Sequence, residues 1–144
     1  MRRHESLAPL SREHHPSLLL AQLLKKDAPA YRGMPTEPVS KAAYAIEQFD
    51  SSIQQHFSKE EEMLEKIHGL NHEIDMLAAE IIQDHRELTD NFIAIRSSDD
   101  LANDLHKLGN KLEQHIRKEE RILFPLIEQY CPEGMLAEIK LLLH

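Results

Sequence analysis

The chain has 144 residues, a formal net charge of −8 and a single cysteine. This length suits one domain with a hydrophobic core and is short for two, and the acidic excess argues against a nucleic-acid partner, which requires a basic patch. One cysteine excludes an internal disulfide and fits a reducing compartment, and no apolar run is long enough to span a membrane. We therefore expect a cytoplasmic protein without a membrane partner.

The first predicted helix runs from about Ser11 to Lys26, after an N-terminal tail of residues 1–10. Ser11 has the type of side chain that caps a helix N-terminus, and leucines recur along one side of the helix. Residues 27–38 are rich in proline and contain a glycine, a composition typical of a linker.

Two longer helices are predicted next, from about Ser40 to His68 and from about Asn71 to Arg96. Gly69 lies between them and is suited to ending the first of the two. Apolar residues recur at helical spacing in both segments, which predicts one buried face on each helix.

The fourth predicted helix begins at about Leu101 and ends near Cys131. The apolar stripe expected to face the core continues through Ile122 and Leu126. Pro125 predicts a bend, because proline lacks the N–H that a helix interior needs.

Residues 133–144 are expected to form a short amphipathic fifth helix at the C-terminus. Short turns between long helices predict antiparallel neighbours. The expected fold class is therefore all-α, an up-down-up-down antiparallel four-helix bundle over residues 11–130, within one domain of residues 1–144.

The most informative feature of the chain is a repeated His-x-x-x-Glu phrase, His56 with Glu60 and His115 with Glu119. Residues four apart on a helix lie on one face, so each phrase aims an imidazole and a carboxylate at one spot. These groups are ligands of borderline first-row metals such as iron, manganese and zinc. Because both phrases lie on predicted apolar stripes, the repeat predicts a pair of metal ions inside the bundle.

Two further histidine positions complete the expected ligand set. His85 lies on the apolar face of the third helix, and its separation from the flanking turns places it at the depth of His56 and His115. The first helix offers His14 or His15. The helical register favours His14, which shares a stripe with apolar residues, and His15 remains a candidate.

The neighbouring acidic residues have a different expected role. Glu61 and Glu120 follow the motif glutamates and point about 100° away from the stripes, so we expect them to be solvated. Burying the histidines and glutamates without a metal would leave unpaired charges in the core, which favours metal ligation over ordinary core packing. Without metal, we expect Glu60, Glu119 or both to take up a proton.

The ordered pattern of these residues resembles the hemerythrin-like HHE cation-binding domains over residues 4–130. The pattern is Ser11-Arg12-Glu13-His14-His15, then His56-x-x-x-Glu60, then Asp84-His85-Arg86-Glu87-Leu88, then His115-x-x-x-Glu119-Glu120 followed by Leu123-Phe124-Pro125. The resemblance implies a non-haem di-iron centre, with the two motif glutamates bridging the metals and the histidines as terminal ligands.

The chain departs from the oxygen-carrying members of that family on the third helix. Those proteins have a His-x-x-x-His pair there, which gives them five terminal histidines. Here Ile81 and Thr89 stand four residues to either side of His85. This departure puts reversible oxygen carriage in doubt, and a fifth nitrogen would have to come from His15 or His4.

The expected function is that of a non-haem di-iron protein that binds, senses or detoxifies a small oxidant (dioxygen, nitric oxide or peroxide), or that handles iron. Four histidines and two bridging glutamates leave exchangeable positions on near-octahedral iron, as such ligands require. We expect a metal- and diatomic-binding protein rather than a dedicated enzyme, with zinc and manganese as alternative metals. The alternative function is a partner-binding helical module with a structural zinc or manganese site. The sequence identifies no redox partner.

Overall fold

The computed structural model describes residues 2–144, and these residues contain helices and no strand, which confirms the all-α prediction. The helices are α1 (Ala8–Leu23), α2 (Pro38–Gln48), α3 (Gln54–Lys66), α4 (His72–Ala94), α5 (Leu101–Lys118), α6 (Phe124–Tyr130) and α7 (Glu133–Leu143). The short C-terminal helix expected from residue 133 is α7. Within residues 2–144, no helix is long and apolar enough to cross a lipid bilayer.

Two of the predicted long helices are each interrupted by a π-helical segment. Phe49–Ile53 joins α2 to α3, and Glu119–Leu123 joins α5 to α6. The irregularity expected at Pro125 therefore begins earlier in the chain, in the segment that ends just before α6. A 3₁₀ turn, Ile95–Ser97, ends α4.

The N-terminus of α1 lies at Ala8, so the predicted start at Ser11 is wrong. Leu7 occupies the N-cap position without a side-chain cap, and Pro9 lies in the first turn, where its missing N–H costs no helical hydrogen bond. Ser11 is inside the helix, and its hydroxyl donates a hydrogen bond to Glu120 at 2.8 Å.

The turn between α3 and α4 follows the sequence prediction closely. Gly69 has a φ of +88°, in the left-handed region that glycine adopts at low cost. Asn71 caps α4, because its side chain accepts a hydrogen bond from the backbone N–H of Ile74 at 3.1 Å. Local side-chain chemistry thus specifies where α4 begins.

The π-helical segment Glu119–Leu123 changes which later residues face the core. Ile122, expected on the buried stripe, is 51% exposed, whereas Leu123 is fully buried. One extra residue in a helical turn rotates all later side chains by about 100°. The stripe extrapolated from an uninterrupted α-helix is therefore wrong after Glu119.

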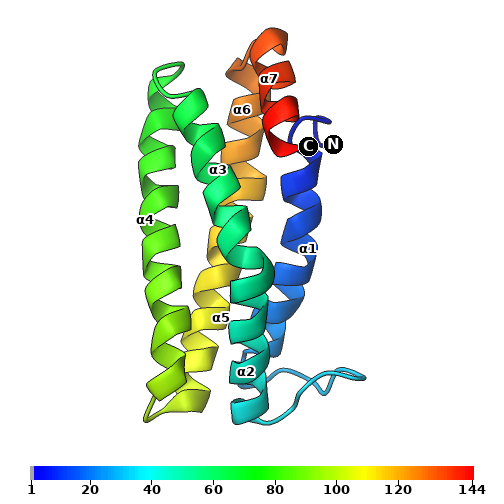
Figure 1. The fold of residues 1–144 in the computed structure, drawn as a ribbon, viewed down its shortest axis with the longest axis vertical. Coiled ribbons are helices and arrows are strands. Elements are labelled where there is room, and N and C mark those ends of the chain that lie inside the picture. Colours follow the sequence, from blue (N-terminus) through cyan, green and yellow to red (C-terminus); the bar gives the residue numbers. More distant parts are fainter. Residues whose placement is uncertain (1) are drawn as a thin grey trace.

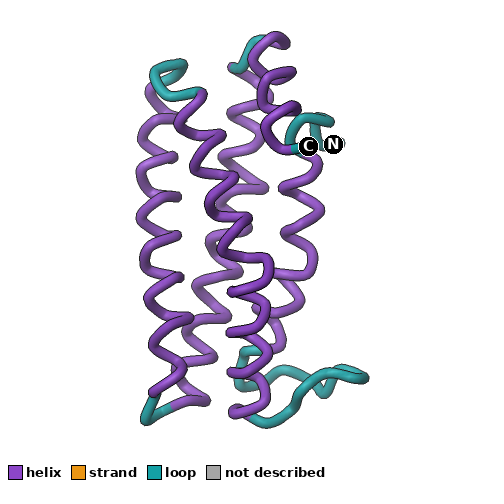
Figure 2. Tube along the Cα trace, in the orientation of Figure 1, coloured by secondary structure: helices purple, strands orange, loops and turns teal. Residues whose placement is uncertain are grey.

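The long helical segments run lengthwise beside one another, as Figure 1 shows for α1, α2–α3, α4 and α5–α6. The longest loop joins α1 to α2 at the end of the molecule opposite α7 (Figure 2). Two apolar clusters fill the interior, one including Leu20 and Leu108 and the other including Met63 and Phe124. Along each long helical segment, buried histidines lie between residues of the two clusters.

Helices α1 and α5 approach each other closely at Gly109. A Cβ at this position would lie 2.6 Å from the carbonyl oxygen of Ala21 and 3.2 Å from the Cβ of Leu24. Glycine is a poor residue for a helix interior, so its presence here is explained by the close backbone contact.

We expect Gly109→Ala to lower the free energy of unfolding by roughly 1–3 kcal/mol, because crowding against backbone outweighs the gain in helix propensity. Gly134→Ala in α7 is the matched control. A Cβ at Gly134 meets no atom within 4 Å, so this substitution should stabilise the protein by up to about 1 kcal/mol. Urea unfolding measures both changes, and a stabilising Gly109→Ala would show that the two helices can separate without cost.

Candidate metal centre

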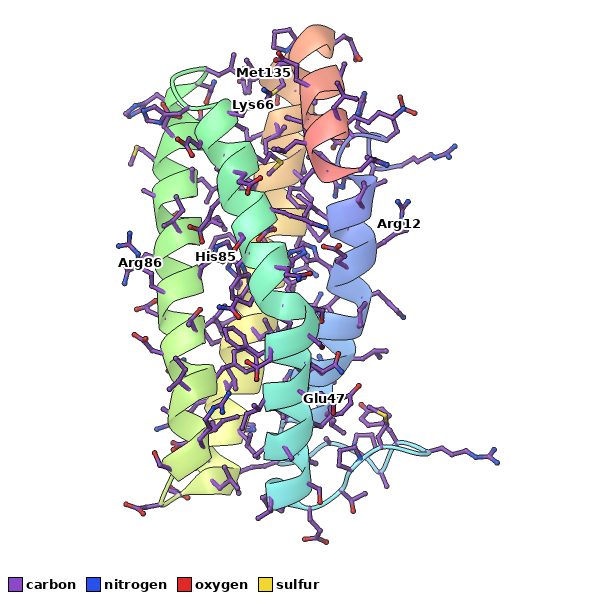
Figure 3. The ribbon with its side chains drawn as sticks, in the orientation of Figure 1. Arg12, Glu47, Lys66, His85, Arg86 and Met135 are labelled. Carbon is purple, nitrogen blue, oxygen red and sulfur yellow. The ribbon has the colours of Figure 1, made fainter. Side chains whose placement is uncertain are left out.

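Six ionisable side chains meet in the interior between the two apolar clusters. Each long helical segment supplies one histidine, and the segments α2–α3 and α5–α6 each add a glutamate. Apart from Ser6, these six are the buried polar residues of the described chain: His14, His56, Glu60, His85, His115 and Glu119. Figure 3 shows the contrast on α4, where His85 points into the bundle and Arg86 points away from it.

The π-helical segments lie next to the two His-x-x-x-Glu phrases. The segment Phe49–Ile53 ends just before the turn that carries His56, and Glu119 is the first residue of the second segment. Single π turns inside α-helices are frequent at functional sites, because the extra residue re-aims the side chains that follow. Here each π turn changes which side chains face the interior, in a helical segment that buries both polar ligands and apolar residues.

The six side chains form two ligand groups that share both glutamates. One group is His14, His56, Glu60 and Glu119, and the other is Glu60, His85, His115 and Glu119; within each group the ligand atoms lie within 4.8 Å of one another. A carboxylate that belongs to both groups can bridge two metal ions, whereas each histidine can serve only one.

The glutamate oxygens lie between the imidazoles of the two groups. The Nε2 atoms of His56 and His85 lie 3.1 Å and 3.0 Å from the two different oxygens of Glu60. The Oε1 atom of Glu119 lies 3.1 Å from Nε2 of His14 and 3.2 Å from Nε2 of His115. Each carboxylate thus faces one histidine of each group.

Four of the ligand atoms are buried and make no hydrogen bond of good geometry, although both nitrogens among them lie within ion-pair distance of a glutamate oxygen. They are Nε2 of His56, Nε2 of His115, Oε2 of Glu60 and Oε2 of Glu119. A buried polar atom without a partner costs free energy, and such atoms are rare in folded proteins. Because all four are of the type that binds first-row metals, the donor set fits a metal pair.

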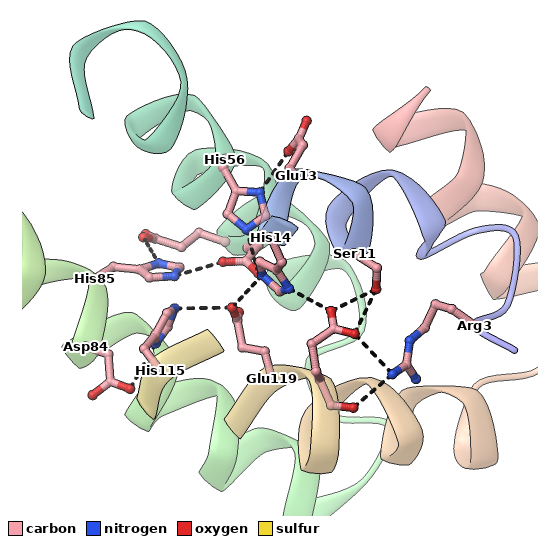
Figure 4. Close-up of polar contacts among 12 residues, drawn as sticks. Arg3, Ser11, Glu13, His14, His56, Asp84, His85, His115 and Glu119 are labelled. Atoms are coloured by element: carbon pink, nitrogen blue, oxygen red, sulfur yellow. Dashed lines mark hydrogen bonds and ion pairs between the residues drawn. The ribbon is translucent and has the colours of Figure 1, made fainter. Parts of the chain in front are cut away.

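An outer ring of carboxylates holds the other nitrogen of every imidazole, as Figure 4 shows. Each Nδ1 lies within hydrogen-bond distance of one carboxylate on a neighbouring helical segment: His14 of Glu120 at 2.6 Å, His56 of Glu13 at 2.8 Å, His85 of Glu61 at 2.8 Å and His115 of Asp84 at 3.1 Å. A carboxylate can only accept, so each Nδ1 donates and each Nε2 is directed toward the glutamates. This arrangement is typical of metal-binding histidines.

The expectation that Glu61 and Glu120 are solvated holds only in part, because their side chains are 42% and 28% exposed and each also contacts an imidazole. Both lie about 100° from the buried stripe of their helices, and from there each reaches an imidazole on an adjacent helix. The apolar stripes did not single out Glu13 and Asp84, which contact His56 and His115. The signal was present as adjacency, because every outer carboxylate stands directly beside a member of the central cluster in the sequence.

The two candidates on α1 have different environments. His14 is buried in the cluster, whereas His15 is exposed and belongs to neither ligand group. His4, a candidate for a fifth nitrogen, lies before α1 and its Nδ1 contacts the hydroxyl of Ser6 at 2.8 Å. Of these histidines, the structure brings only His14 to the two glutamates.

The surrounding carboxylates raise the pKa of three imidazoles. Burial alone would lower the pKa of His14, but hydrogen bonds to carboxylates, including Glu119 and Glu120, more than offset burial and raise it to about 12. The same opposition between burial and nearby carboxylates raises the pKa of His56 to about 9 and that of His115 to about 10. Without metal, these rings therefore carry protons near neutral pH.

The glutamate at the centre behaves in the opposite way from the sequence expectation. Burial would raise the pKa of Glu60, but the charge of His56 and hydrogen bonds with Glu119 and His14 hold this pKa well below its usual range. The expectation that Glu60, Glu119 or both take up a proton in the absence of metal is therefore wrong for Glu60, and it stays a prediction for Glu119. Protons lie on the imidazoles of His14, His56 and His115, because these rings have carboxylates at both nitrogens.

A family model for the hemerythrin HHE cation-binding domain matches residues 5–127 of the chain. Neither a curated protein nor a solved structure matches the sequence.

We predict that the metal-free protein loses stability as the pH rises. The folded-state pKa values of His14, His56 and His115 lie above the ordinary 6.5, so their contribution to stability is complete below pH 6.5 and is lost as the pH rises through about 9 to 12. Metal binding should have the opposite dependence, because the metal competes with these protons.

Thermal unfolding of chelator-treated protein across this pH range tests the prediction. His15→Ala, on the exposed side of α1, should leave the slope unchanged, and His56→Ala should flatten it. A melting temperature that rises between pH 6.5 and about 9 would contradict the proton assignment.

Proposed function

The chain belongs to the hemerythrin HHE cation-binding domain family, and from that premise we propose that it binds two iron ions at the six buried side chains. The proposed role is to bind, sense or detoxify a small oxidant, or to handle iron. The observation that carries the proposal is the set of four buried ligand atoms that make no hydrogen bond within a cluster of histidines and glutamates.

The donor count supports two metal positions with a shared pair of bridges. Glu60 and Glu119 belong to both groups, and each group adds two histidines, one pair from α1 and α3 and the other from α4 and α5. Each position then has two nitrogens and two carboxylate oxygens, fewer than the six donors of near-octahedral iron. Iron would supply redox chemistry and the exchangeable positions that dioxygen, nitric oxide or peroxide needs.

The outer carboxylates keep the imidazoles ready to bind metal. Because Nδ1 of His14 donates to Glu120 and Nδ1 of His56 donates to Glu13, the proton stays on the outer side of each ring. Once Nε2 releases its own proton, its lone pair faces the metal position, and the ring cannot rotate away without breaking a hydrogen bond. Because the rings are already oriented, metal binding requires only that they release protons.

Surface hollows border three of the four imidazoles, and these give a small ligand places to approach the cluster. A cavity of about 110 Å³ lies beside His56, between α1 and α3. Its lining includes Glu13, Pro16, Ile53 and Lys59. Hollows of about 260 Å³ and 430 Å³ border His85 and His115. The apolar clusters on either side of the centre limit the access of water.

We also propose that the four long helical segments form an up-down-up-down antiparallel bundle in a single domain. Each segment supplies one histidine to one cluster, and Figure 1 shows the segments running lengthwise beside one another. The single Cys131 is buried and fits a reducing compartment such as the cytoplasm.

Protein loaded with iron should carry close to two metal ions per chain. His56→Ala and His115→Ala each remove a donor from a different group, so each should lower that number. His15→Ala is the matched control and should leave it unchanged. Metal analysis by mass spectrometry measures the ratio; a wild-type value below half an ion per chain would refute the proposed centre.

The oxidant proposal predicts a spectral change on reaction with a small oxidant. The ferrous protein should gain near-ultraviolet absorption when mixed with dioxygen or peroxide, because ferric iron with carboxylate ligands absorbs there and zinc does not. Two results would instead support a partner-binding helical module with a structural metal. The protein would be purified with zinc or manganese, and its spectrum would not change with dioxygen, peroxide or nitric oxide.

A further inference from the structure

Arg3, in the segment that precedes α1, anchors this segment to α6 and to the π-helical segment before it. One guanidinium nitrogen of Arg3 donates to the carboxylate of Glu128 at 2.7 Å. The other donates to the carbonyl oxygen of Glu120 at 2.9 Å and lies 3.3 Å from its carboxylate. Arg3 thus links α6 and the preceding π-helical segment to the chain N-terminal to α1.

Two contacts connect Arg3 to His14. The first passes through Glu120, whose carboxylate accepts from Nδ1 of His14 at 2.6 Å (Figure 4). The second passes through Phe124, because Cζ of Arg3 lies 5.5 Å from the ring centroid and the same ring stacks on His14 at 5.6 Å with an interplanar angle of 7°. Both routes end on the same imidazole.

The second ligand group has a different cation in the corresponding place. Lys118 donates to Asp84 at 2.9 Å, and Asp84 accepts from Nδ1 of His115. Lysine provides a point charge from the same helix as the histidine, whereas Arg3 provides a planar fork from outside the helices. The two metal positions are therefore supported by different parts of the chain.

We propose that Arg3 is a positioning residue for the metal position formed by His14 and His56, so that retention of this one metal depends on the segment before α1. The inference rests on the proposed metal centre. Glu120 is only partly buried, and without Arg3 its carboxylate keeps the hydrogen bond from the Ser11 hydroxyl but loses its cation. The acceptor that fixes the proton and the ring orientation of His14 is then held less firmly.

Arg3→Gln tests the proposal by its effect on one metal of the two. Metal-free protein is titrated with Fe²⁺ without oxygen, in competition with a chelator, and native mass spectrometry counts chains with none, one or two ions. We expect one ion to bind about 10-fold more weakly, the lower end of the effect of removing such outer contacts, while the other is unchanged. Chains with a single ion should therefore accumulate.

Arg2→Gln is the matched control, because Arg2 is the exposed neighbour of Arg3 in the sequence. The Arg2→Gln variant should bind both ions as the wild type does. Arg3→Lys should restore the binding only in part, since lysine cannot bridge Glu120 and Glu128 with a planar fork. Thermal unfolding of the metal-free variants separates this effect from a purely structural one, in which stability falls and both affinities stay at the wild-type values.

A double-mutant comparison assigns the affected position. In a Glu120→Ala background, Arg3→Gln should have a clearly smaller effect than in the wild type, because the route through Glu120 is already broken and the contact through Phe124 remains. In an Asp84→Ala background, which removes the contact of His115, the 10-fold loss should persist. Equal loss of both ions in Arg3→Gln, or wild-type binding of both, overturns the inference; failure of the wild-type protein to bind iron would instead refute the metal centre.

Discussion

Glu60 and Glu119 lie fully buried in the interior, and ionised carboxylates are tolerated there only if cations or donors surround them. Four imidazoles from four helical segments meet this requirement. The constraint also sets how far each helix can slide, because a shift of one turn, about 5.4 Å, would remove its imidazole from the cluster. Apolar packing is non-directional and cannot fix this register as sharply.

The imidazoles that contact the buried carboxylates need hydrogen-bond partners for their second nitrogens, and these partners lie nearer the surface. Each imidazole has another nitrogen to satisfy, and an outer carboxylate on a neighbouring helical segment accepts from it. Some of these carboxylates are paired in turn with a cation, as Glu120 is with Arg3 and Asp84 is with Lys118. The polar network therefore extends from the centre to the surface, and protons or metal ions can neutralise its core.

The two π-helical segments reconcile the polar centre with the apolar clusters on either side. Both occur in the helical segments that carry a His-x-x-x-Glu phrase, and the other described helices have none. A regular helix that aims His115 and Glu119 at the centre would bury Ile122 above it. The extra residue turns Leu123 inward and leaves Ile122 exposed instead.

The sequence alone determined the helical fold, the turn at Gly69 and seven ligand candidates, six of which are buried, because periodicity and i,i+4 spacing are local properties. It also favoured His14 over His15, which matches the buried position of His14. Only the tertiary structure decided the outer partners, such as Glu61 on His85, since these contacts join different helices. The same holds for the rotation after Glu119 and for the protons on the imidazoles, which depend on the charges that folding brings together.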